Sequence, residues 1–103
     1  MEQELCKLTL VYPPDVEELI IELLLTADPP LKGFTTWAAD GHGLDFGQAS
    51  AAERVRGRVR RRVMLLVLPR SRLPALLETI RQRAGAPHMA YWVERVESFG
   101  RLA

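Results

Sequence analysis

The fold of this chain is decided by residues 61–69, RRVMLLVLP, where two arginines lead into six consecutive apolar residues and a proline. An unbroken run rich in valine and leucine is typical of a strand, and Pro69 ends it because proline cannot donate to a hydrogen-bonded ladder. Side chains alternate across a strand. One face therefore carries Val63, Leu65 and Val67, and the other carries Met64, Leu66 and Leu68. The run predicts a strand over 58–68 that is apolar on both faces.

Working outward from this strand, the chain divides into six predicted elements. We expect strands over 4–11, 33–40, 58–68 and 88–96, and helices over 16–25 and 72–84. The second helix is indicated by apolar residues that recur at helical spacing on one face, namely Leu73, Leu76, Leu77, Ile80 and Ala84. At its ends we expect Ser71 as the N-cap, Pro74 in the first turn and Gly85 as the C′ residue.

The order β-α-β-β-α-β predicts an α+β, ferredoxin-like fold in one domain spanning residues 1–103. In this arrangement an antiparallel four-stranded sheet carries both helices on one face. The other face would normally be polar, yet here it is apolar along most of its length. The tail, residues 97–103, is too short to cover it, so we expect a homo-oligomer that stacks these open faces together.

The charges are divided between the two halves of the chain. The formal net charge is +1, but residues 1–53 sum to −8 and residues 54–103 to +9. We interpret the halves as neutralising each other, within or between subunits; nucleic-acid binding is the alternative. It is not expected, because Tyr91 and Trp92 alone do not make the aromatic surface of an RNA-binding sheet. Trp37, Trp92 and Phe99 are expected to be packing anchors.

Cysteine usage and hydropathy bear on the cellular compartment. The single cysteine, Cys6, excludes an internal disulfide and is expected to be a small buried apolar residue. No apolar run approaches the roughly 18 residues that cross a bilayer, and the acidic start of the chain lacks the pattern of a secretory signal. We therefore expect a cytoplasmic protein that is not inserted in a membrane.

Four segments carry a resemblance to a known family. LTLVYPPDVEELIIELLL (8–25), ADGHG (39–43), ERVRGRVRRRVMLLV (53–67) and AYWVERVESFG (90–100), in this layout, resemble the PII signalling superfamily of nitrogen regulatory proteins. They are most similar to an uncharacterised PII-like branch often encoded beside heavy-metal efflux systems. The resemblance implies a trimer whose flexible T-loop, here about residues 41–57, docks on a partner protein, and a role in metal ion resistance.

The same resemblance implies a ligand-binding cleft between subunits. Its residues here would be Gly41, Gly43, Arg58, Arg60, Gly85, His88 and Arg101, with an adenine nucleotide as the effector. Guanidinium groups such as those of Arg58 and Arg60 can meet phosphates or carboxylates through two hydrogen bonds each. The sequence departs from nucleotide-binding PII proteins in its turn RAGAPHM (83–89), which has no lysine, and residues 41–57 contain no tyrosine that could be modified.

Two further interpretations stay open. His42 and Asp45 could ligate a divalent transition metal, which would make the protein similar to the CutA-type metal-binding proteins, but a closed site needs further ligands. The other is a structural oligomer without an effector. No nucleophile–base pair, carboxylate pair or phosphate-loop lysine is found, so we expect a protein that is not an enzyme. A further interpretation of the arginines of residues 54–62 is that they form ion pairs with the acidic first half of the chain across a subunit boundary.

Overall fold

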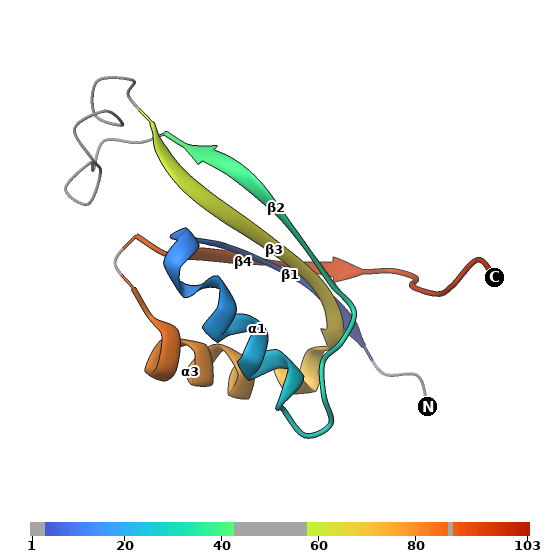
Figure 1. Cartoon of the computed structure of the whole chain (residues 1–103). Helices are drawn as coiled ribbons and strands as arrows, with labels where there is room; N and C mark the ends of the chain where they lie inside the picture. The colour runs from blue at the N-terminus through green and yellow to red at the C-terminus, as the bar shows by residue number, and fades with distance from the viewer. Residues whose placement is uncertain (1–3, 43–57, 87) are drawn as a thin grey trace.

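A computed structural model describes residues 4–42, 58–86 and 88–103 of the chain (Figure 1). The strands are β1 (Leu5–Tyr12), β2 (Phe34–Gly41), β3 (Val59–Pro69) and β4 (Ala90–Val96). The helices are α1 (Glu17–Leu25) and α3 (Leu73–Ala84), which follow the 3-10 turns η1 (Pro14–Val16) and η2 (Arg70–Arg72). The predicted element order is confirmed.

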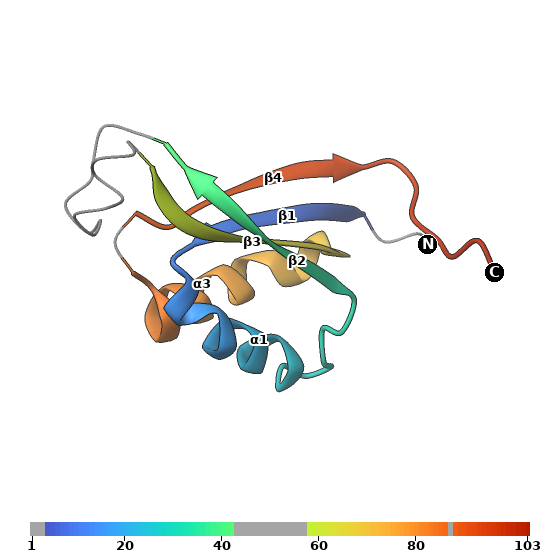
Figure 2. The same ribbon diagram turned by 45° about the horizontal axis from the view of Figure 1, so that its top comes forward.

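The strands form one sheet in the order β2-β3-β1-β4, and every neighbouring pair is antiparallel. Both helices lie against the same face of this sheet, which leaves the opposite face open (Figure 2). The α+β, ferredoxin-like prediction is therefore confirmed. The tail, residues 97–103, extends away from the sheet and every residue in it is exposed, so it does not fold back over the open face.

The core lies between the sheet and the helices. Alternate residues of the two central strands point into it, and they are almost fully buried: Cys6, Leu8, Leu10 and Tyr12 from β1, and Met64, Leu66 and Leu68 from β3. The predicted face of α3 is confirmed, since four of its five residues are buried and Leu77 packs against the core. Cys6 is confirmed as a buried residue, and burial raises the pKa of its thiol more than the nearby Arg70 charge lowers it.

Two predictions at the ends of α3 are wrong in detail. Ser71 is not the N-cap, because it lies inside the turn η2; the residue before the helix is Arg72, whose side chain makes no capping hydrogen bond. Gly85 follows the helix with φ −60° and ψ 131°, so it does not adopt the left-handed C′ conformation. It is suited to glycine for another reason, because a Cβ there would collide with the carbonyl oxygen of Arg81.

The last strand is also shorter than predicted. It begins at Ala90, whereas His88 lies in a turn with φ 67°, in the left-handed region that non-glycine residues rarely adopt. Sequence periodicity cannot detect this turn, because the apolar residue Met89 continues the alternation of β4 backwards.

Strands β2 and β3 continue beyond the end of β1 as a two-stranded arm. The last pair between β1 and β3 joins Tyr12 to Arg62, but β2 and β3 pair onward to Gly41 and Val59. We call residues 39–41 and 58–61 the hairpin arm; it projects from one end of the sheet (Figure 1). Residues 43–57, which hold most of the predicted T-loop, lie outside the described residues.

Candidate functional site

The open face of the sheet is the first surface with a functional implication. The register places Val63, Leu65 and Val67 of β3 on it, beside Val11 of β1. Val63 is buried and the others are half-buried although no helix covers them. The predicted apolar character of this face is confirmed.

Two tryptophans flank this surface on the outer strands. Trp37 of β2 pairs with Val63, and Trp92 of β4 lies opposite Thr9 of β1. They are 44% and 48% exposed, and Phe99 in the tail is 65% exposed. The prediction that these three residues are packing anchors is therefore wrong within one subunit. Covering the exposed half of one tryptophan would contribute about 2–3 kcal/mol, by the area of an aromatic side chain.

The open face carries one ion pair near the tail end of the sheet. Lys7 Nζ lies 3.0 Å from Glu94 Oε2, across the β1–β4 pair, and the two side chains are 34% and 50% exposed. An exposed pair of this kind contributes little to the stability of the isolated subunit. Its place within an apolar surface would restrict how a second copy can be stacked on it.

The hairpin arm gathers charged residues at the opposite end of the sheet. Asp40 and Arg60 are paired in the β2–β3 register, and Arg58 Nη1 lies 3.6 Å from Asp40 Oδ2. Both members of that ion pair are about half exposed, so it is weak and open to competition by an anion. A hollow of about 400 Å3 lies here, lined by Asp40, Arg60, Arg61 and Arg62 among others.

Gly41, at the end of β2, lies close to the side chains of β3. A Cβ on Gly41 would lie 3.0 Å from Cγ of Arg61 and 3.4 Å from a methyl group of Val59. A side chain at residue 41 would therefore require the side chain of Arg61 to shift by a few tenths of an ångström. Arg61 is in turn held by a hydrogen bond that its Nη1 donates to the carbonyl oxygen of Arg60, at 3.0 Å.

A partly buried polar network ties the base of the arm to α1. Arg62 donates from Nε to Glu17 Oε1 at 2.9 Å and from Nη2 to Thr36 Oγ1 at 3.1 Å. The hydroxyl of Tyr12, which is fully buried, donates to the same Glu17 oxygen at 2.7 Å. Burial first, and then the bond to Glu17, raise the pKa of Tyr12 well above its usual range.

This network bears on one interpretation of the arginines. Arg62 pairs with Glu17 and Arg58 with Asp40, both within one subunit, while pairing across a subunit boundary stays a prediction. Sequence reasoning did not find Glu17 and Tyr12 as partners. A signal was present, since Arg62 shares the inward face of β3 with Met64 and so requires a nearby acceptor.

The predicted ligand residues that the structure describes lie at two ends of the molecule. Gly41, Arg58 and Arg60 belong to the arm, while Gly85 and His88 lie in the turn before β4, which starts opposite Val11 at the same end of the sheet. The tail, which includes Arg101, extends from the opposite end of the molecule (Figure 1), so Arg101 does not meet the others within one subunit.

The predicted metal ligands are not tested by this arrangement. His42 is exposed at the end of β2, while Asp45, like Gly43, lies outside the described residues. Within residues 4–42, 58–86 and 88–103, no three side chains of histidine, cysteine, aspartate or glutamate gather closely enough to hold a metal ion. In the same part of the chain, neither helix has the length and apolarity that a membrane span requires.

Comparison with known proteins adds a family and a set of similar folds. The model of the family described as "Protein of unknown function (DUF3240)" matches residues 1–103. No protein of curated function matches the chain. A DUF3240 family protein from Shewanella baltica OS155 superposes with a TM-score of 0.77 at 19% identity, over 100% of both chains.

Two PII proteins have the same fold. Arabidopsis thaliana PII bound to citrate gives a TM-score of 0.73 at 15% identity, over 98% of this chain and 82% of that chain. CPII, a nitrogen regulatory PII-like protein from Thiomonas intermedia K12 bound to ADP, AMP and bicarbonate, gives 0.70 at 20% identity, over 95% and 94% of the two chains. The PII-like fold expected from the resemblance is confirmed.

Proposed function

The chain belongs to the DUF3240 family and has the PII-like fold, and we propose that it is a PII-like regulatory or sensor protein rather than an enzyme. In this proposal, a small effector binds at the hairpin arm of a homo-oligomer, and the segment between β2 and β3 docks on a partner protein. The observation that supports this proposal is the hairpin arm, where Arg58 and Asp40 form a weak ion pair at the ends of β2 and β3, next to the segment that joins these strands.

The oligomer is supported by the open sheet face. Its half-buried valines and leucine, and its two half-exposed tryptophans, are the residues that a second copy would cover. The stacking of open faces would place the arms and the turns before β4 of different copies near subunit boundaries. A closed trimer is the arrangement that the resemblance implies, and Arg101 of one copy would then complete the site of another.

The effector is proposed to be an anion, and the first candidate is an adenine nucleotide. The arm offers the guanidinium groups of Arg58 and Arg60, which suit a phosphate or a carboxylate. The structure of CPII contains ADP, AMP and bicarbonate, all of them anions. An anion that displaces Asp40 from Arg58 would change the contacts exactly where the chain leaves the sheet, and so bias the docking segment.

The partner suggested by the resemblance is a component of a heavy-metal efflux system. The charges at the arm would allow such docking to respond to the effector, because a bound phosphate neutralises much of the local positive charge. Co-purification of this chain with the efflux proteins encoded beside it, with and without nucleotide, would test the partner.

A thermal-shift panel tests the effector. Ligands that bind the native state raise its midpoint in proportion to their occupancy. We expect ADP, AMP or ATP to raise the midpoint of the wild type, and Arg60→Ala to lose the shift. Lys32→Ala removes an exposed cation from the connection between α1 and β2, at the other end of β2 from the arm, and is the control that should keep the shift.

The same panel includes zinc, copper, cobalt and nickel ions. A shift with a metal alone, lost in His42→Ala, would replace the nucleotide proposal by a CutA-like metal-binding role. If neither the nucleotides nor the metal ions shift the midpoint while the oligomer stays intact, the protein is a structural oligomer without an effector, and the sensor role is refuted.

A further inference from the structure

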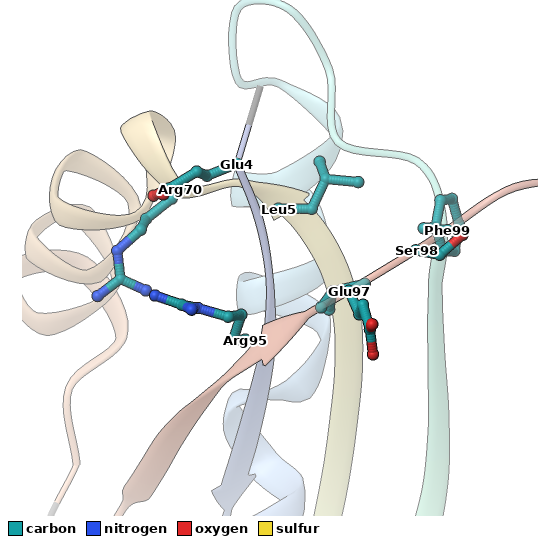
Figure 3. Close-up of a pocket in the computed structure, with 8 residues that line it drawn as sticks. Glu4, Leu5, Arg70, Arg95, Glu97, Ser98 and Phe99 are labelled. Atoms are coloured by element: carbon teal, nitrogen blue, oxygen red, sulfur yellow. The ribbon is translucent and has the colours of Figure 1, made fainter. Parts of the chain in front are cut away.

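A second hollow lies at the end of the sheet away from the hairpin arm. It has a volume of about 650 Å3 and is formed where β1 begins, where β3 runs into η2, and where β4 ends (Figure 3). Its wall includes the aromatic ring of Phe99 and the hydroxyl-bearing Ser98 from the start of the tail. The residues of the proposed effector site do not line it, so this hollow is a separate feature of the fold.

Two arginines from different elements, η2 and β4, meet at this hollow. Arg70 follows Pro69, and its backbone N–H donates to the carbonyl oxygen of Glu4 at 2.9 Å, which fixes its backbone beside the start of β1. Arg95 lies on β4 opposite Cys6. Figure 3 shows the two side chains extending toward each other, with their guanidinium groups adjacent in this view.

Two acidic residues share the hollow with these arginines. Glu4 and Glu97 also line the hollow, but the side chain of Glu97 points away from the arginines (Figure 3). Among the described residues, neither Arg70 nor Arg95 takes part in an ion pair, in contrast to Lys7 and Glu94 nearby. Two neighbouring guanidinium groups repel each other. An anion bound by both adds an attraction to each of them, and these two attractions offset the repulsion.

We propose that this hollow binds a small multivalent oxyanion, a phosphate or a polycarboxylate, between the guanidinium groups of Arg70 and Arg95. Each guanidinium presents planar pairs of N–H donors, which fit two oxygens of one phosphate or carboxylate group. An ion with charges on more than one side can accept from both arginines at once.

This site is independent of the proposed effector site. It uses residues from the turn after β3 and from the end of β4, and it would exist in a protein that binds nothing at the hairpin arm. Its ligand is defined by oxyanion chemistry alone, without an adenine base.

The test is isothermal titration calorimetry of the full chain with inorganic phosphate and, separately, with citrate, both at ionic strength matched with sodium chloride. We expect one ion bound per chain. Arg70→Ala and Arg95→Ala should each weaken binding about tenfold or more, because each removes charge-assisted hydrogen bonds. Arg70→Lys and Arg95→Lys keep the charge but lose the paired donors, and should fall between the wild type and the alanine variants.

Two control variants separate this site from others. Arg83→Ala removes an exposed arginine of α3 that does not line the hollow, and Arg60→Ala removes an arginine of the opposite end. Both should bind phosphate and citrate as the wild type does. Circular dichroism of each variant checks that the fold is retained.

Three results would overturn the proposal. The first is no heat of binding for either ion in the wild type. The second is equal weakening in Arg83→Ala, which would indicate diffuse attraction by the basic half of the chain. The third is a change of oligomeric state in Arg95→Ala without anion binding in the wild type, which would show that a carboxylate of another copy occupies the hollow.

Discussion

The two faces of the sheet are built from the same strands, yet one is covered and the other is open. On the helix face, Met64, Leu66 and Leu68 are at most 2% exposed. On the open face, their neighbours Leu65 and Val67 are only half-buried, and Trp37 and Trp92 are nearly half exposed. The difference shows that one subunit supplies cover for one face only, because two short helices span one side of four strands. The chain therefore completes the first core by itself, and we propose that another copy completes the second.

The largest expected effect tests whether the two faces really differ in this way. Leu66→Ala should lower the free energy of unfolding by about 2–5 kcal/mol, as large-to-small changes in a core do. Because its contacts come from the same subunit, this loss should be the same at every protein concentration. Leu65→Ala should instead give a loss that depends on protein concentration, since its missing contacts come from another copy. Urea unfolding at several concentrations measures both, and an equal, concentration-independent loss would remove the distinction.

A second prediction uses two adjacent residues of β4. Trp92 lies on the open face and Tyr91 on the helix face, and both are about half exposed, at 48% and 56%. Trp92→Glu should shift the oligomer toward smaller species, with at least about a tenfold rise in the dissociation concentration, because an unpaired charge would be buried at the interface. Tyr91→Glu is the matched control and should leave the oligomer intact. Light scattering coupled to gel filtration decides between them; equal behaviour of the two variants would place the interface elsewhere.

The smallest expected effect concerns the covered face at its boundary with the hairpin arm. Burial and the bond to Glu17 raise the pKa of Tyr12, so the folded protein keeps a proton that the unfolded chain loses near pH 10. Stability from this group is present below about pH 10 and is lost as the pH rises above it, by at most about 1.4 kcal/mol per pH unit.

The measurement is urea unfolding of the wild type and of Tyr12→Phe between pH 8 and pH 11. The variant loses the hydrogen bond to Glu17, but its stability should fall less steeply with pH. Cys6, whose pKa burial also raises, is present in both proteins and cancels from the difference. Tyr91→Phe, with an exposed ring, should keep the slope of the wild type, and a reduced slope in that variant would argue against the role of Tyr12.

Several local features were predictable and several were not. The strand 58–68 could be predicted from its unbroken run of apolar residues, and the apolar face of α3 from apolar residues that recur at helical spacing. Ser71 and Gly85 were misjudged because the ends of a helix depend on backbone angles that residue type only biases. The turn at His88 was missed because a left-handed residue leaves no trace in an apolar pattern.

The candidate sites divide in the same way. The arginine-rich residues that lead into β3 could be recognised in the sequence, and the structure places Gly41 opposite Val59 at the end of the same arm, while its predicted role in ligand binding stays a prediction. The partners of Arg62 could not be predicted, since Glu17 lies 45 residues away in the chain. The convergence of Arg70 and Arg95 was not suspected, because neither arginine belongs to a dense cluster.

By itself, then, the sequence determined the order of elements, the PII-like resemblance and the presence of an apolar surface on both faces of the sheet. These follow from periodicity and residue type, which act over a few neighbouring positions. Only the tertiary structure decided which charges meet: Arg62 with Glu17, Arg58 with Asp40, and Arg70 facing Arg95. The physical reason is that these contacts depend on which strands pair and in which register, and antiparallel pairing brings together residues that are far apart in the chain.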